Sequence, residues 1–298
     1  MLRNVTVGLD GSPESLAAAD WAAREAQLRD MPLRLVHARH RQPHTYASLA
    51  GTLMASPVKE PHPDPAERLP REISARLAER HPGLRVSAEQ STERPVPALL
   101  AASRDADLLV LGSRGLSGVT GFLAGSVTLS VVARTERPVV LVRAGEGAGT
   151  GTGTDHLTGD VVLGLDLEDS AGPVIEFAFQ AASHRAANLR VVHGWKPPSS
   201  SGYGAAFDIE PNAELGARVR QELADVLMPW RSKFPGVEVR EQTLIGTAGS
   251  HLVNASRNAA LVVVGRRNRR TRAGNHIGPV THAVLHHTAA PVAVVPHA

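Results

Sequence analysis

Short aliphatic runs alternate along the chain with longer stretches of mixed polar and apolar residues. Residues 5–9, 107–111 and 138–142 are almost continuously aliphatic and do not alternate with polar positions. Strands of that kind are covered on both faces, so the pattern predicts a parallel sheet with helices on each side. Strand–helix alternation with right-handed crossovers favours a doubly wound α/β fold, in which ligands bind at the carboxyl ends of the strands.

The elements of the first half can be placed one by one. Strands are expected at 4–9, 33–38, 84–90, 107–112 and 138–143, and helices at about 14–29, 64–80, 96–104 and 126–134. The second of these helices is predicted to be interrupted at Pro70, because proline removes a helical hydrogen bond.

The second half of the chain repeats the first. Residues 8–37 align with residues 164–193 at a constant offset of 156, and ten of the thirty positions are identical. Two later stretches align at an offset of 153: 99–112 with 252–265, and 138–143 with 291–296. The chain is therefore expected to be a duplication of one unit.

The duplication predicts two tandem domains. Domain 1 is expected at 1–143, a flexible Gly/Thr-rich linker at 144–159, and domain 2 at 160–298. The two domains are called copy one and copy two below. Each is expected to hold a five-stranded parallel sheet flanked by helices.

Composition narrows the classes of function. The chain has no cysteine, which excludes disulfides, thiolate metal sites and cysteine nucleophiles. The pI is about 9.8 but the net charge is only +3, so no general attraction to nucleic acid is expected. The N-terminus lacks the apolar core of a signal peptide, and no apolar run is long enough to span a membrane. We expect a cytoplasmic protein that binds neither membranes nor a specific nucleic acid.

The stretch LGSRGLSGVTGFLAGS carries five glycines directly after a predicted strand. Gly112 and Gly115 are expected to permit positive φ and to let the main chain approach a ligand. Gly125 and Ser126 open the next helix, with Ser126 as N-cap, and the positive end of that helix attracts an anion. Arg114 adds a cation nearby. Phosphate is the anion that suits these features.

The two standard phosphate motifs are absent, since there is no G-x-x-x-x-G-K-[ST] and no G-x-G-x-x-G after the first strand. The spacing Gly112-x2-Gly115-x9-Gly125-Ser126 instead resembles the nucleotide loop of the universal stress protein family, G-x2-G-x9-G-[ST]. The stretches VTVGLDGSPES and LRLVHA extend the resemblance, which covers nearly the whole chain twice. It implies a tandem member of the family with the strand order 3-2-1-4-5 in each copy.

The resemblance also implies a ligand. In ATP-binding members, a first-strand aspartate and a second-strand valine hold the adenosine, and the glycine loop with its Ser or Thr holds the ribose and phosphates. The matching positions are Asp10 and Val36 for adenosine, and Gly112, Gly115, Gly125 and Ser126, beside Arg114, for the ribose and phosphates. The implied cofactor is ATP, with or without Mg²⁺, in a sensor or regulator of the stress response that is not an enzyme.

The matching loop of copy two, VGRRNRRTRAGNHIGP, departs from this pattern. It keeps Gly265 and Gly278 but has Asn268 and Pro279 where copy one has a glycine and the serine. Pro279 removes a hydroxyl and an N–H donor at the mouth of the helix. Five arginines add positive charge: Arg266, Arg267, Arg269, Arg270 and Arg272. Either the second site is lost or it binds a different anion, so we expect one strong nucleotide site per chain, in copy one.

Four histidines are considered as site residues. His282 and His286 lie one turn apart on the last predicted helix, a spacing that can ligate a metal. No third ligand accompanies them, so a solvent-facing pair is expected. His37 and His193 end the second strand of each copy. They suit a hydrogen-bonded structural role at least as well as a place beside the ligand.

Two other functions stay open at this point: a nucleotide-free interaction protein, and an enzyme of a related nucleotide-binding fold with slow ATP turnover. The assembly is predicted from the fifth strands, 138–143 and 291–296, which are aliphatic sheet edges that need cover. We expect the two copies to pair through these strands as an intrachain pseudo-dimer. Two chains are then expected to form a homodimer, the commonest symmetric assembly.

Overall fold

The computed structural model describes residues 3–38, 65–113, 126–144, 159–169, 171–196, 209–268, 270–271, 274–275 and 277–298. In copy one the elements are β1 (Val5–Leu9), α1 (Pro13–Leu28), β2 (Leu33–Ala38), α2 (Pro65–Arg80), β3 (Val86–Ser91), α3 (Pro95–Arg104), β4 (Leu108–Ser113), α4 (Ser126–Arg134) and β5 (Val139–Arg143). In copy two they are β6 (Asp160–Gly164), α5 (Gly172–Arg185), β7 (Leu189–Trp195), α6 (Ile209–Lys233), β8 (Val239–Ile245), α7 (Ala248–Ala255), a 3₁₀ turn (Ser256–Asn258), β9 (Ala259–Arg267), β10 (Arg270–Thr271), β11 (Gly274–Asn275), α8 (Pro279–His287) and β12 (Val292–His297).

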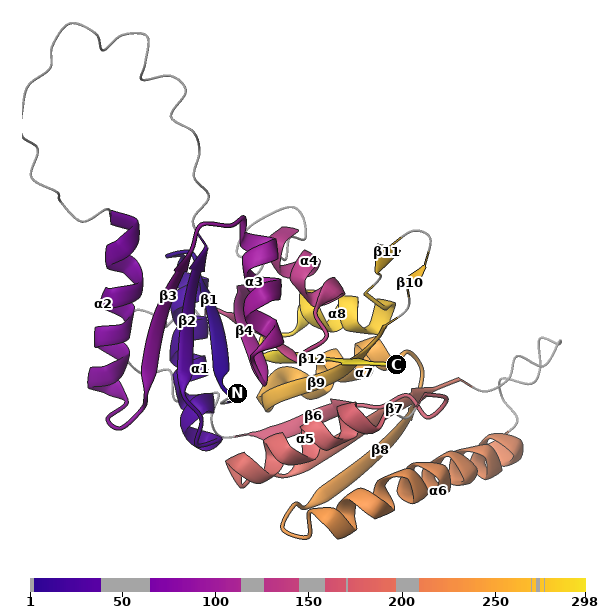
Figure 1. The fold of residues 1–298 in the computed structure, drawn as a ribbon. Coiled ribbons are helices and arrows are strands. Elements are labelled where there is room, and N and C mark those ends of the chain that lie inside the picture. The colour runs from indigo at the N-terminus through magenta and orange to yellow at the C-terminus, as the bar shows by residue number, and fades with distance from the viewer. Residues whose placement is uncertain are drawn as a thin grey trace, which may run out of the picture.

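In the described part of the chain, ten strands form one sheet in the order β3-β2-β1-β4-β5-β12-β9-β6-β7-β8 (Figure 1). Neighbouring strands within each copy are parallel. The doubly wound fold and the order 3-2-1-4-5 are therefore confirmed in both copies. The second copy is reversed relative to the first, so that the two fifth strands meet.

The fifth strands β5 and β12 join the two copies, as expected from their aliphatic sequences. They pair antiparallel, with Val292 opposite Leu141 and Val294 opposite Val139. Each strand thus covers the sheet edge that the other copy would leave open.

The hydrophobic core is divided by face of the sheet and not by copy. Helices α1, α2, α5 and α6 pack on one face, and α3, α4, α7 and α8 pack on the other (Figure 1). In β4, Leu108 and Val110 belong to the first layer, whereas Leu109 and Leu111 belong to the second. Because every side chain of such a strand is buried, the strand reads in the sequence as an unbroken aliphatic run.

Helix α2 runs through Pro70, so the predicted interruption is wrong. Proline removes one backbone hydrogen bond and usually bends a helix. Two side chains after Pro70, Ile73 and Leu77, are 4% and 1% exposed and pack in the core layer under α1 and α2. We attribute the continuity of the helix to this packing, which offsets the lost hydrogen bond.

A buried carboxylate lies where α1 and α5 meet across the two copies. Glu25 is 1% exposed and accepts a 2.6 Å hydrogen bond from Arg29 and a second from Arg185 of the other copy. Arg29 also lies 5.3 Å from the ring of Phe177, and Arg185 lies 5.7 Å from the ring of Trp21. Both pairs of equivalents, Arg29/Arg185 and Trp21/Phe177, are 156 residues apart, so the interface has approximate two-fold symmetry with one glutamate at its centre.

Two further arginines cross between the copies on the opposite face. Arg143, at the end of β5, donates to the carbonyls of Leu285 and His286 at 2.7 and 2.9 Å, at the end of α8. Arg266 of β9 donates to the carbonyl of Ala133 at 3.1 Å and to that of Thr135, at the end of α4. Each copy therefore holds the carboxyl end of one helix of the other copy.

Among the helices that the structure describes, none combines the length and the apolar character needed to cross a bilayer.

Candidate functional site

Both copies build the same frame at the carboxyl ends of their first, second and fourth strands. The Nδ1 atom of His37 lies 2.9 Å from the carbonyl of Leu9, and that of His193 lies 2.9 Å from the carbonyl of Leu165. A carbonyl can only accept, so Nδ1 carries the proton in both rings. This confirms the structural role considered for both histidines, which tie the end of the second strand to the end of the first.

The helix that follows the fourth strand is tied back in the same way. In copy one, the hydroxyl of Thr128 on α4 donates to the carbonyl of Gly112 at 3.4 Å. In copy two, the hydroxyl of Thr281 on α8 donates to the carbonyl of Gly265 at 2.9 Å. The amino end of each helix is thereby held beside the end of the neighbouring strand, next to the end of the first strand.

Asp10 follows β1 and is exposed. Its Oδ1 accepts hydrogen bonds from the backbone N–H and the hydroxyl of Ser12, at 3.0 and 2.6 Å. Ser12 is in turn the N-cap of α1 and accepts from the N–H of Ser15 at 3.2 Å. The carboxylate is therefore held in a fixed orientation by the turn that leads into α1.

Val36 lies on β2, opposite Gly8 of β1, and is 2% exposed. The described part of the chain buries this side chain next to the strand whose end carries Asp10. Contact between Val36 and an adenosine remains a prediction.

Gly112 is glycine for a reason that differs from the one expected. It is not among the described residues with positive φ. A Cβ at this position would lie 2.6 Å from the carbonyl carbon of Glu14 and 2.7 Å from the nitrogen of Ser15. The expected positive φ is therefore wrong: a side chain is excluded because the first turn of α1 packs directly against the end of β4.

Ser126 is the first residue of α4 and is exposed at its amino end. The N-cap precedes the first helical residue, so the expected N-cap role is wrong for Ser126, which is itself helical. Arg114, Gly115 and Gly125 lie outside the described residues. The phosphate half of the copy-one site is thus described only at its two ends, Gly112 and Ser126.

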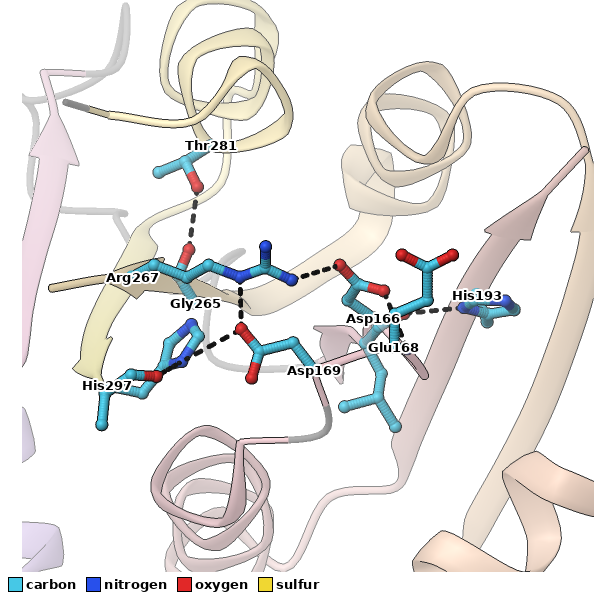
Figure 2. Close-up of polar contacts among 10 residues, drawn as sticks. Asp166, Glu168, Asp169, His193, Gly265, Arg267, Thr281 and His297 are labelled. Atoms are coloured by element: carbon cyan, nitrogen blue, oxygen red, sulfur yellow. Dashed lines mark hydrogen bonds and ion pairs between the residues drawn. The ribbon is translucent and has the colours of Figure 1, made fainter. Parts of the chain in front are cut away.

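Copy two contains a cavity of about 560 Å³ at the carboxyl ends of β6 and β9. Loop and helix residues that follow β6 close one side, and the first turn of α8 closes the other (Figure 2). The residues that line it include Leu165, Asp166, Asp169, Val174, His193, Leu252, Val264, Arg267, Gly278, Pro279, Val280, Thr281 and His297. It occupies the place in copy two that the nucleotide site is expected to occupy in copy one.

An ion-pair cluster forms the polar side of this cavity. Arg267 donates to Oδ2 of Asp166 at 3.2 Å and forms a second ion pair through Nε with Asp169 (Figure 2). Nδ1 of His297 lies 3.8 Å from Asp169. Oδ1 of Asp166 accepts from the N–H of Glu168 at 3.1 Å, which repeats the turn seen at Asp10.

The family follows from the sequence comparison. The family model described as the Universal stress protein family matches the chain twice, over residues 1–143 and 158–296. This chain belongs to the universal stress protein family. A universal stress protein from Mycobacterium tuberculosis is 32% identical over 309 residues, which cover 97% of this chain and 96% of the relative.

Solved structures agree with this assignment of the fold. The crystal structure of a universal stress protein from Archaeoglobus fulgidus covers 100% of both chains with a TM-score of 0.63 at 17% identity. A solved universal stress protein in complex with cAMP covers 48% of this chain at 27% identity and a TM-score of 0.35. The first of these supports the tandem universal stress protein fold.

The arginines of the second universal stress copy are not all exposed loop residues. β9 extends through Arg267, so Arg266 and Arg267 are part of a strand. Arg266 is 3% exposed, and burial lowers the pKa of its guanidinium. These two arginines therefore do not add free positive charge to a loop, because Arg266 binds the end of helix α4 and Arg267 binds two carboxylates.

The histidine pair on α8 is also placed differently from the expectation. The rings of His282 and His286 are 4.1 Å apart, and His282 is exposed. His286 is 6% exposed, and burial, followed by the neighbouring His282, His287 and Arg143, lowers its pKa. The described residues include no group of three or more metal ligands. The expected solvent-facing pair is wrong for His286, which is buried and lies close to Arg143 of the other copy.

Sequence reasoning missed two residues of the copy-two cavity, Asp169 and His297. Asp169 follows the strand-end Asp166 by three residues and replaces the proline that copy one has at position 13. The alignment of residues 8–37 with residues 164–193 already contains this signal, because it places Asp169 opposite Pro13. His297 has no such signal, since it reaches the cavity only because β12 pairs with β9.

Proposed function

We propose that copy one binds ATP and that the protein is a cytoplasmic, ATP-responsive regulator of the stress response. The observation that carries the proposal is the juxtaposition of Asp10 and the start of α4. β1 and β4 are neighbours in the sheet, so the oriented carboxylate of Asp10 and the exposed Ser126 emerge at the same edge. In doubly wound folds, this edge is where ligands bind.

The described residues fit an adenine nucleotide. A carboxylate whose orientation is fixed by the backbone can accept hydrogen bonds from ribose hydroxyls. The amino end of α4 provides N–H groups that have no partner within the helix, and a positive dipole end for phosphate. Gly112 brings the end of β4 against the first turn of α1, and Thr128 ties α4 to the same strand end, so both helices begin at this edge. Mg²⁺ would bind to the phosphates of ATP, and the carboxylate of Asp10, directly after the first strand, would help to orient it.

ATP acts in this proposal as a ligand that shifts conformation or association, and not as the substrate of a reaction. A ligand shifts such an equilibrium only through its different affinities for the two states. We propose that the two states differ in the association of chains, and that the associated state is a homodimer. The nucleotide-free interaction protein and the slow ATPase are the outcomes that the experiments below would reveal.

The first prediction concerns Gly125→Val. A branched side chain at the mouth of α4 occupies the space in which phosphate and main chain meet, so ATP affinity should fall at least about tenfold. Isothermal titration calorimetry measures the affinity, and circular dichroism verifies that the variant is folded. The parent chain should bind ATP with a stoichiometry near one.

Gly278→Val is the matched control in copy two. Gly278 has a φ of −62°, and a Cβ there would meet nothing within 4 Å, so the fold should tolerate the change. It should leave the ATP affinity and stoichiometry unchanged. Unchanged ATP binding by a folded Gly125→Val chain would remove the copy-one site from consideration.

Two further measurements separate the alternatives. Adenine nucleotide released by boiling the purified protein distinguishes a nucleotide-binding protein from a nucleotide-free interaction protein. Product formed in stoichiometric excess over the protein would identify an enzyme and contradict the proposal.

A further inference from the structure

We propose that the copy-two cavity binds a phosphate-free ligand of nucleoside size, through hydrogen-bond donors of the ligand to Asp166 and Asp169. The adenosine-like size and shape rest on the function proposed for copy one, because the two copies are duplicates. The absence of phosphate is argued from copy two alone.

The cavity has the dimensions of a small-molecule site. Its volume of about 560 Å³ lies within the range of roughly 300–1,000 Å³ that is common for small-molecule pockets. Its apolar walls suit a flat ring system and are built by Leu165, Val174, Leu252, Val264 and Val280. The charged groups of Asp166, Asp169 and Arg267 lie together at the ends of β6 and β9 (Figure 2), so the same cavity offers a bound molecule both apolar and polar contacts.

The charges of the described residues that line the cavity do not favour a phosphate. Arg267, which matches Arg114 of copy one, is engaged by both Asp166 and Asp169. The guanidinium of the neighbouring Arg266 binds carbonyls of copy one. A phosphate that approached Arg267 would meet two carboxylates that share one guanidinium, and like charges at such distances repel strongly.

Copy two differs from copy one at two positions that affect the binding of an anion. Asp169 stands at the position of Pro13, so copy two has an additional negative charge at the turn after its first strand. Pro279 is the first residue of α8 and offers no N–H. Both differences act against phosphate.

The same groups favour a ligand that donates hydrogen bonds. The carboxylates of Asp166 and Asp169 are 58% and 29% exposed, and ionised carboxylates only accept. His193 also lines the cavity, and its Nδ1–H is directed at the carbonyl of Leu165, so Nε2 is the acceptor nitrogen of that tautomer. The hydroxyl and amino groups of a nucleoside match a wall of acceptors, and a polyphosphate does not.

Hydrogen–deuterium exchange of the full chain with adenosine or ATP tests the inference, because it reports on each copy separately. Adenosine should slow exchange at the β6–α5 turn, residues 164–172, and at the start of α8. ATP should slow exchange at the matching β1–α1 turn, residues 8–16, and leave 164–172 unchanged. These turns follow the first strands, which are aligned in the two copies.

The variant Asp169→Asn removes one negative charge with little change in shape. It should release Arg267 from one partner and raise the affinity of copy two for ATP by about tenfold or more. Adenosine binding to copy two should weaken, because an amide side chain is a weaker acceptor than a carboxylate. Glu168→Gln is the matched control, since it removes an exposed charge one residue away that does not line the cavity.

The outcomes are distinguishable from those of the proposed function. Protection of residues 164–172 by ATP in the parent chain, or no protection there by adenosine, would overturn the inference. An equal effect of Glu168→Gln and Asp169→Asn on ATP binding would also overturn it. Protection of copy two by adenosine without any effect of ATP on copy one would support this inference and contradict the proposed function.

Discussion

At the scale of single residues, Glu25 is the clearest link between the two copies. Its carboxylate is buried between an arginine of its own helix and an arginine of the other copy. Burial by itself would raise the pKa of Glu25, but the charges and hydrogen bonds of Arg185 and Arg29 outweigh it, and the pKa is lowered. The carboxylate therefore stays ionised in the folded chain and balances two buried cations.

Glu25→Gln should lower the free energy of unfolding by about 3 kcal/mol, because it leaves two buried guanidinium groups without a counter-charge. Urea denaturation followed by circular dichroism measures the change. Glu89→Gln is the matched control, since Glu89 forms a partly exposed ion pair with Arg34 and should cost less than about 1 kcal/mol. Equal effects of the two substitutions would contradict the role given to Glu25.

The same residue predicts a dependence on pH. Because its pKa is lower in the folded chain, the unfolded chain takes up the proton first as the pH falls. The stabilisation is present above the ordinary pKa of 4.5 and is lost as the pH falls below it. The difference in stability between the parent and Glu25→Gln should accordingly shrink below that pH, whereas a constant difference would show that the charge of Glu25 does not matter.

At the scale of elements, the helices α4 and α8 are each held at both ends. Their amino ends lie at the two candidate sites and are tied down by Thr128 and Thr281. Their carboxyl ends are bound by Arg266 and Arg143 of the opposite copy. A cation at a helix carboxyl end interacts favourably with the helix dipole and satisfies carbonyls that have no partner inside the helix.

Arg266→Met should destabilise the chain by about 1–3 kcal/mol, because it removes a buried donor whose hydrogen bonds to the carbonyls of Ala133 and Thr135 join the two copies. Arg266→Lys should recover only part of this loss, since one ammonium group lacks the planar fork of a guanidinium. Thermal and urea unfolding measure both variants.

The control for this pair is Arg137→Met. Arg137 also donates to a helix-end carbonyl, that of Arg104 at 3.3 Å, but it is exposed and acts within its own copy. Its replacement should change the stability by less than about 0.5 kcal/mol. A loss of stability as large as that of Arg266→Met would show that the burial of Arg266 between the copies does not increase its contribution to stability.

At the scale of the whole molecule, the two copies form one sheet and share two core layers (Figure 1). A homologous unit on its own would expose the edge of its fifth strand and one end of each layer. The duplication therefore produces one folded unit and not two independent domains joined by a linker.

We expect one cooperative unfolding transition for the chain. The chain has three tryptophans, Trp21 in copy one and Trp195 and Trp230 in copy two. A variant with both copy-two tryptophans changed to phenylalanine reports on copy one. Trp21→Phe, which installs the residue type of the matching Phe177, reports on copy two. In each variant, the urea midpoint measured by fluorescence should equal the midpoint measured by circular dichroism. A fluorescence midpoint that differs from the circular dichroism midpoint would show that the copies unfold independently.

Much of the fold could be predicted from the sequence, because the strands are marked by local aliphatic runs and each run occurs in both copies. The aliphatic runs at 5–9, 107–111 and 138–142 are buried on both faces and form strands, as such runs do in parallel sheets. The internal repeat doubled every such signal, and the family resemblance supplied the strand order. The aliphatic edge strands predicted how the copies meet. Pro70 misled the prediction because tertiary packing outweighed a local preference.

The sequence alone determined the duplication, the class of fold and the sheet edge at which each copy carries its candidate site. Only the tertiary structure decided what individual side chains do there. Gly112 could not be assigned from its loop, because the reason for it is the backbone of α1, almost a hundred residues away. Arg266 and Arg267 are adjacent and chemically identical, yet the guanidinium of Arg266 binds the other copy and that of Arg267 binds the two carboxylates of the cavity, because successive side chains of a strand point to opposite faces. Long charged side chains reach far from their own backbone, and their partners are fixed only when distant elements pack together.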